Sequence, residues 1–202
     1  MSRVSKSDVL GMLEEHGAIV SGHFELLSGL HSPTFIRAGL VLQYPHMAHK
    51  FALGICGKFP QQVDAVLPSS AGAVPIGQEV ARRKKCRVIS VERAASGMSL
   101  TRDCHLSRGE KVLIVQDVLT TGRSTSEAVS LALAYGATVV GIAAVVDRSS
   151  AALPLRVPFR PLVCYPTRLD AAGSCPLCAK GVPLSRRLEG GESPRWPAPS
   201  TP

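Results

Sequence analysis

Residues 111–126, KVLIVQDVLTTGRSTS, contain the side chains best suited to chemistry in this sequence. Four consecutive apolar residues, 112–115, are typical of a strand buried on both faces of a parallel sheet. Asp117 follows them, and a loop of small and hydroxyl-bearing residues leads to a helix expected to begin at about Glu127. Ligands of open α/β sheets bind at the carboxyl ends of strands, and N–H groups at a helix N-terminus attract phosphate. The stretch therefore predicts an anion-binding site; the alternative is a polar turn that only caps the next helix.

The elements around this stretch alternate between helix and strand. Apolar periodicity and turn residues predict helices at residues 5–17, 46–58, 76–85 and 127–135, and strands at residues 63–67, 87–91, 112–115, 137–146 and 159–165. This alternation predicts an α/β domain with a central parallel sheet flanked by helices. Two short extended runs within residues 22–39 predict a hairpin, and the long connection at residues 92–110 predicts a lid.

The composition is that of one globular domain. The chain has 202 residues, of which 45% are hydrophobic and 19% are charged, which is enough for one full core. Because no segment has the apolar length of a membrane span or a signal peptide, we expect a cytoplasmic protein with no membrane contact, whose six cysteines are reduced. We expect the domain to occupy residues 1–184 and residues 185–202, rich in Pro, Gly and charge, to form a disordered tail.

Two strings resemble a known family. The apolar run, Asp117, two apolar residues and Thr-Thr-Gly-x-Ser resemble the signature with which type I phosphoribosyltransferases bind phosphoribosyl diphosphate (PRPP). The string Leu-x-Ser-Gly-x-His-Ser-Pro-x-Phe, which ends at Phe35, resembles the N-terminal segment of orotate phosphoribosyltransferases, where it forms part of a hood over the base. The resemblance covers about residues 17–184 and places the hood at about residues 17–40.

The resemblance implies an activity and a set of site residues. It implies transfer of the phosphoribosyl group of PRPP to orotate, which gives orotidine 5'-monophosphate and diphosphate, with Mg2+ held mainly by PRPP and not directly by the protein. Asp117 and Arg93 would be catalytic, and a homodimer would share its active sites through the lid. The implied PRPP contacts are Gln116, Asp117, Val118, Leu119, Thr120, Thr121, Gly122, Arg123 and Ser124, and the implied orotate contacts are Thr120, Arg148 and, in addition, Phe35.

Three departures from the family pattern leave a second function open. Gln116 stands where the family has a second acid, Ala73 replaces a Gly, and no lysine lies between Lys85 and Lys111. These departures favour a non-catalytic regulator that senses PRPP and binds nucleic acid through its net charge of +8. The retained hood string and Arg148 oppose that alternative, and an aromatic content of 4% makes nucleic-acid binding unexpected.

The C-terminal part contains one CxxC pair, Cys175 and Cys178. Such a pair is half of a four-thiolate zinc site, and the sequence has no second CxxC pair and no HxxxH pattern to complete it. The sequence therefore predicts no zinc and a structural or incidental role for the two cysteines.

Overall fold

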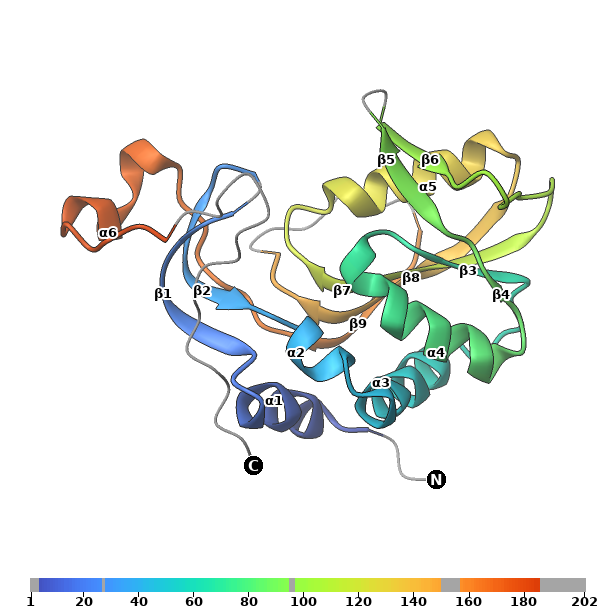
Figure 1. Ribbon diagram of the computed structural model, residues 1–202, viewed down its shortest axis with the longest axis horizontal. Helices are drawn as coiled ribbons and strands as arrows, with labels where there is room; N and C mark the ends of the chain where they lie inside the picture. Colours follow the sequence, from blue (N-terminus) through green and yellow to red (C-terminus); the bar gives the residue numbers. More distant parts are fainter. Residues whose placement is uncertain (1–3, 27, 95–96, 150–156, 186–202) are drawn as a thin grey trace.

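The computed structural model describes residues 4–26, 28–94, 97–149 and 157–185 (Figure 1). Its centre is a five-stranded parallel sheet with the strand order β4-β3-β7-β8-β9. The bounds of these strands are β3 Ala65–Pro68, β4 Arg87–Val88, β7 Lys111–Leu119, β8 Thr138–Asp147 and β9 Phe159–Cys164. The predicted α/β class and the parallel sheet are confirmed.

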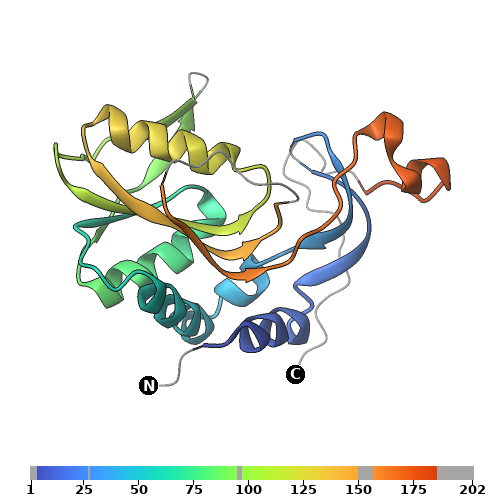
Figure 2. The same ribbon diagram turned by 180° about the vertical axis from the view of Figure 1, so that it is seen from behind.

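Helices cover both faces of this sheet (Figures 1 and 2). Helices α1, α3 and α4 lie on one face and α5 lies on the other; their bounds are α1 Lys6–Glu15, α3 Pro45–Lys58, α4 Val74–Lys84 and α5 Arg123–Ala134. Strand β7 shows why its sequence is continuously apolar. Leu113 and Val115 belong to the core under α3 and α4, whereas Val112 and Ile114 belong to the core under α5. Successive side chains point to opposite faces, so a strand covered on both sides has no polar face.

Two predicted boundaries beside the loop at residues 120–122, called the phosphate loop below for the anion that its sequence predicts, are wrong. Strand β7 continues to Leu119, two residues beyond Asp117, because it stays paired in register with β8 up to Asp147. Helix α5 begins at Arg123, four residues before the expected start at Glu127, because its N-cap is Gly122. The loop between strand and helix is therefore shorter and tighter than the sequence indicates.

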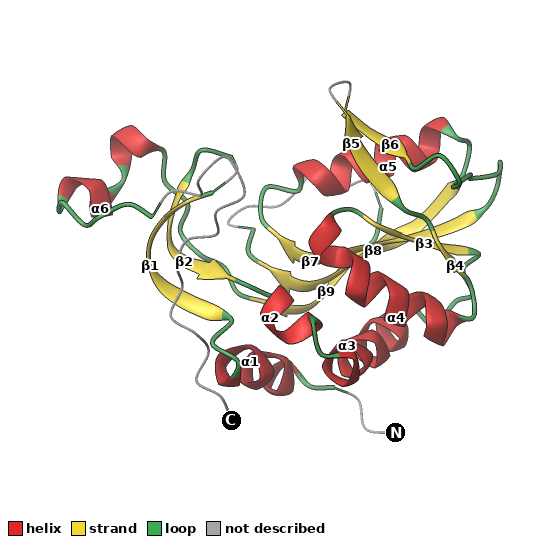
Figure 3. Cartoon of the chain, viewed as in Figure 1, coloured by secondary structure: helices red, strands yellow, loops and turns green. Residues whose placement is uncertain are grey.

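The connection at residues 92–110 is not a plain loop. Strands β5 (Val91–Ala94) and β6 (Gly97–Leu100) pair in it as an antiparallel hairpin. The strand predicted at residues 87–91 is correspondingly split between the short β4 and the start of β5. The hairpin projects from the side of the sheet that α5 covers (Figure 3).

A second hairpin forms the hood. Strands β1 (Ile19–Glu25) and β2 (His31–Ile36) pair antiparallel, with an irregularity between Ser21 and Phe24, and α2 (Gly39–Leu42) follows them. The C-terminal segment, residues 170–185, returns from β9 to this hood and contains the short helices η2 (Ala172–Ser174) and α6 (Pro176–Ala179). Its two ends form bridges to the hood, Asp170 to His31 and Ser185 to Phe24. The tail predicted at 185–202 lies, beyond Ser185, outside the described residues.

No described helix has the length and apolar character needed to cross a membrane.

Candidate active site at the carboxyl ends of the strands

The loop between β7 and α5 presents backbone donors at the edge of the sheet. Gly122 has a φ of 75°, a left-handed conformation that favours glycine, and it forms the N-cap of α5. Because glycine has no side chain to accept from the first N–H groups of the helix, these donors remain available to a ligand. Helix dipole and free N–H groups together favour an anion at this point.

Asp117 and Gln116 are tied to the neighbouring loop after β3. Gln116 Nε2 donates to Asp117 Oδ1 at 2.9 Å, and Ser70 Oγ donates to the same oxygen at 3.2 Å. Gln116 Oε1 accepts from Ser69 Oγ, so both ends of the amide are engaged within the chain. Burial raises the pKa of the Asp117 carboxyl above its ordinary value, although hydrogen bonds from backbone N–H groups and from Ser70 oppose the shift. The amide at position 116 thus supports the Asp117 carboxylate.

Gly72 allows the β3 loop to approach Asp117. A Cβ atom on Gly72 would lie 2.5 Å from Asp117 Oδ2, which is inside van der Waals contact. Ser70 Oγ accepts from the N–H of Ala73 at 3.2 Å and so caps the short helix η1 (Ala71–Ala73) that contains Gly72. The replacement of a glycine by Ala73 does not disturb this turn, since Ala73 is fully buried in ordinary helical conformation.

Arg148 lies beside the phosphate loop and is held by the hood. Its backbone N–H donates to Leu119 O at 2.8 Å, and its side chain is 1% exposed. Nη2 donates to Ser32 Oγ and Thr34 O, both at 2.8 Å, while Nε has no partner. Burial lowers the pKa of the guanidinium. Arg148 does not pair with Asp147, whose carboxylate accepts from Ser149 N and Oγ at 2.9 and 2.7 Å.

Arg93, on the β5–β6 hairpin, reaches the start of α5. Its Nη2 lies 3.3 Å from Ser124 Oγ and 2.8 Å from Glu127 Oε2. Arg123 contacts the same carboxylate at 3.1 Å. Burial raises the pKa of Glu127, but hydrogen bonds from Arg123 and Arg93 outweigh this effect and the pKa lies below its ordinary value. The structure therefore brings Arg93 to the phosphate loop predicted from the sequence.

Comparison with known proteins identifies this arrangement. Residues 46–164 match the phosphoribosyl transferase domain family. The chain is also 36% identical over 182 residues to the orotate phosphoribosyltransferase of Caldicellulosiruptor bescii, an alignment that covers 90% of this chain and 96% of the relative. The chain belongs to the phosphoribosyltransferase family.

Solved structures of phosphoribosyltransferases share the fold. The orotate phosphoribosyltransferase of Aeropyrum pernix superimposes with a TM-score of 0.65 at 24% identity and covers 77% of this chain and 93% of its own. The adenine phosphoribosyltransferase of Rhodothermus marinus gives a TM-score of 0.58 at 20% identity and covers 79% of this chain and 99% of its own. Because enzymes named for different bases share the fold, the fold alone does not select the base.

Some residues of the candidate site were missed from the sequence. Ser69 and Ser70, which hold Gln116 and Asp117, directly follow β3, and their sequence signal was a loop of small residues. Ser32 and Thr34, which hold Arg148, belong to the hood string, but nothing in the string links it to position 148. Phe35 is partly buried on β2 with its ring centroid 5.7 Å from that of Phe24, and its contact with a base remains a prediction.

The premise that no other residues could complete a metal site with Cys175 and Cys178 is wrong. The sequence offered no further ligands for this pair, yet the hood of this phosphoribosyltransferase places His23 and His31 against it. Linear spacing missed the two histidines because they precede the cysteines that they contact by 147 to 155 positions, which is most of the chain length.

Proposed function

We propose that this phosphoribosyltransferase transfers the phosphoribosyl group of PRPP to orotate, with release of diphosphate, in pyrimidine biosynthesis. The relatives that align over about nine tenths of the chain are named for this activity. Nothing in the comparisons supports the alternative of a nucleic-acid-binding regulator.

The choice of orotate rests on Arg148, which is buried and has only neutral hydrogen-bond partners. A buried guanidinium whose partners are two hydroxyls and a carbonyl, and whose Nε has no partner, is a cation without a counter-charge among the described residues. Orotate carries a carboxylate on its ring, whereas adenine, hypoxanthine and uracil carry none. A guanidinium binds a carboxylate through charge-assisted and bidentate hydrogen bonds. Arg148 lies one hydrogen bond from the phosphate loop, so a base held there would adjoin the ribose.

The remaining residues suit a reaction that separates charge. Breaking the anomeric bond of PRPP builds positive charge on the ribose and negative charge on the departing diphosphate, so the site has mainly to orient the partners and stabilise both charges. In our proposal the N–H and hydroxyl groups of residues 120–124 hold the 5'-phosphate. Asp117 accepts from the ribose hydroxyls, and Arg93 faces the diphosphate.

The donor set near Asp117 fits a PRPP-bound magnesium ion. Asp117 has hydroxyl, amide and backbone partners and no cation among its hydrogen-bond partners. Mg2+ typically takes one or two protein carboxylates together with substrate phosphates. We propose that PRPP supplies most of the ligands and that Mg2+, when bound, neutralises charge on the diphosphate.

One assay tests the proposal. The protein is incubated with PRPP, Mg2+ and, separately, orotate, uracil and hypoxanthine, and nucleotide and diphosphate are measured. We expect orotidine 5'-monophosphate from orotate and little product from the other bases. Absence of this product under conditions where PRPP binding is demonstrated would overturn the proposal.

The proposal includes a cytoplasmic homodimer whose active sites are shared through the β5–β6 hairpin. The hairpin projects from the body of the molecule (Figure 1) and bears the half-exposed Arg93. Mixing an Arg93→Ala chain with an Asp117→Asn chain should restore one intact site in each heterodimer. If mixing restores no activity although heterodimers form, Arg93 serves the loop of its own chain, which it contacts through Ser124.

A further inference from the structure

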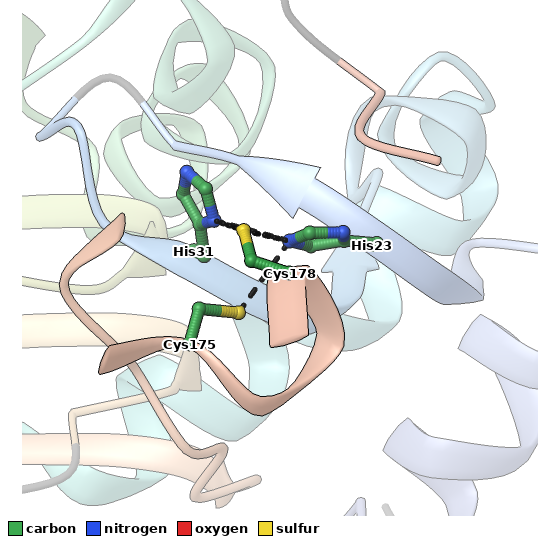
Figure 4. A group of neighbouring side chains, drawn as sticks. All are labelled: His23, His31, Cys175 and Cys178. Carbon is green, nitrogen blue, oxygen red and sulfur yellow. Dashed lines mark hydrogen bonds between the residues drawn. The ribbon is translucent and has the colours of Figure 1, made fainter. Parts of the chain in front are cut away.

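Four potential metal ligands converge between the hood and the C-terminal segment (Figure 4). His23 lies on β1 and His31 on β2, with exposed fractions of 2% and 4%. Cys175 is the N-cap of α6 and is 3% exposed, and Cys178 lies on the exposed side of the same short helix. One ligand atom from each residue lies within 4.8 Å of all the others.

The distances between these atoms approach those of a tetrahedral zinc site. With Zn–N of about 2.0 Å and Zn–S of about 2.3 Å, ligand atoms at the corners of a tetrahedron lie about 3.3 to 3.8 Å apart. His23 Nε2 lies 3.0 Å from His31 Nδ1, 3.5 Å from Cys175 Sγ and 3.7 Å from Cys178 Sγ. Cys178 Sγ lies 3.3 Å from His31 Nδ1. Four of the six distances are therefore within a few tenths of an ångström of tetrahedral values, and the remaining two, from Cys175 Sγ to His31 Nδ1 and to Cys178 Sγ, do not exceed 4.8 Å.

The other ring nitrogen of His23, Nδ1, is hydrogen-bonded in the way that is typical of a metal-binding histidine. Its Nδ1 lies 2.8 Å from Val182 O, a carbonyl that can only accept. Nδ1 therefore carries the proton and the lone pair of Nε2 points toward the two cysteines and His31. A histidine that binds a metal typically donates its other N–H to a carbonyl or carboxylate, which sets the tautomer and the ring orientation. Val182 itself belongs to the C-terminal segment, so the contact also ties that segment to β1.

Three potential donors, His31 Nδ1, Cys175 Sγ and Cys178 Sγ, surround His23 Nε2. Because an imidazole nitrogen has a single lone pair, Nε2 can accept a full hydrogen bond from only one of them, whereas a metal ion at the centre would satisfy all four atoms. An iron–sulfur cluster typically takes four thiolates, whereas two nitrogens and two sulfurs in a tetrahedral arrangement are typical of zinc.

We propose that His23, His31, Cys175 and Cys178 bind one structural zinc ion. The two thiols lose their protons to solvent on binding, so that two thiolates balance the two positive charges and the site is neutral. All four positions of the ion are filled by protein, which leaves none for a substrate and distinguishes this site from a catalytic one. The cysteine pair would thus have a structural function that is separate from phosphoribosyl transfer.

The site holds the C-terminal segment on the hood. The segment meets β2 at Asp170, where His31 N–H donates to Asp170 O at 2.8 Å, and meets β1 at Ser185, whose N–H donates to His23 O at 2.7 Å. Zinc would link the middle of the segment to the same two strands. Adjacent residues of a strand point to opposite faces, so His31 faces the metal site while Ser32 faces Arg148.

Metal analysis tests this proposal on the full chain. Protein expressed without added zinc and purified without chelator should contain about one equivalent of zinc per chain. Cobalt added to the reduced, metal-free protein should give the absorption of tetrahedral cobalt with thiolate ligands. Cys178→Ser should lower retained zinc by more than about tenfold; because Cys178 is exposed, this change leaves the core intact.

Cys164→Ser is the matched control, since Cys164 is also exposed but lies on β9. It should retain zinc at the level of the native chain. Chelation of the native protein should lower its melting temperature and speed amide exchange in residues 19–36, and neither effect should occur in Cys178→Ser. A native chain that contains no zinc and, when reduced, binds neither zinc nor cobalt would overturn the proposal, as would equal zinc retention by Cys178→Ser and Cys164→Ser.

Discussion

The two halves of the candidate active site are built in different ways. The phosphate half draws its residues from one strand–loop–helix unit and from the neighbouring β3 loop, and Gln116, Asp117 and Ser70 link the two. The base half depends on Arg148 and on hood residues that precede it by 116 and 114 positions. The first half is a local motif on the rigid sheet, whereas the second exists only when the hood is docked. Changes in the base half should therefore affect orotate selectively, and changes in the phosphate half should affect PRPP and the fold of the loops.

Arg148→Ala should have the largest effect of the changes considered. Losing a charge-assisted hydrogen bond of this kind costs about 1.5 to 3 kcal/mol, or roughly tenfold to more than a hundredfold. We expect kcat/KM for orotate to fall by that factor while PRPP binding changes little, as measured by steady-state kinetics with each substrate varied. Arg160→Ala, which removes an exposed cation elsewhere, should leave both unchanged. Equal losses for orotate and PRPP would place Arg148 outside the base half.

Gln116→Glu should weaken the phosphate half. It replaces the 2.9 Å donor of Asp117 with a second carboxylate, and loss of a hydrogen bond to a charged group costs about 1.5 to 3 kcal/mol. Burial already raises the pKa of Asp117 in the folded state. The protonated carboxyl therefore favours folding fully at a pH below the unfolded pKa, and this contribution to stability is lost as the pH rises through the folded pKa. A neighbouring carboxylate raises that pKa further. The stability deficit of the variant should therefore shrink as the pH is lowered through the raised pKa.

Urea unfolding of the native and Gln116→Glu chains over a pH series measures this deficit. A deficit that is independent of pH would show that the amide acts by packing and not by supporting the Asp117 charge.

Gly72→Ala should disturb Asp117 by contact alone. The new Cβ at 2.5 Å from Oδ2 forces the carboxylate or the β3 loop to move, and overpacking of this kind costs about 1 to 3 kcal/mol. We expect weaker PRPP binding and a lower melting temperature. Gly57→Ala in α3 is the control, because its Cβ meets nothing within 4 Å, and it should be neutral or slightly stabilising. Unchanged PRPP binding in Gly72→Ala would show that the loop after β3 does not contribute to the PRPP site.

Ser32→Ala should give the smallest effect. It removes one of the hydrogen bonds that Arg148 Nη2 donates to the hood, which is worth about 0.5 to 1.5 kcal/mol. The KM for orotate should rise severalfold, and the effect should disappear when Arg148 is already alanine, as a double-mutant cycle would show. An undiminished effect in the Arg148→Ala background would mean that Ser32 acts on the base independently.

The local half of the site was also the half that the sequence predicted well. The apolar run of β7 and the small residues after it carry their structural meaning in neighbouring positions, so the sheet, the loop and Asp117 could be inferred. The boundaries at Leu119 and Arg123 could not, because pairing with β8 and the left-handed Gly122 determine them. The partners of Arg148 and the histidines beside Cys175 depend on how the hood docks, and single-sequence patterns contain no signal for contacts over more than a hundred residues.

The path of the C-terminal segment also determines the order in which the molecule can be completed. Residues 19–36 are synthesised before the sheet, and the strands from β3 to β9 are all synthesised before Asp170 and Ser185, since a chain is made from its N-terminus. The hood, however, receives backbone hydrogen bonds from Asp170 and Ser185, which are made near the end of the described chain. Such contacts of very long sequence separation form slowly because the closing loop costs entropy first. The hood is thus synthesised before the sheet but reaches its final structure only after the C-terminal segment has been made.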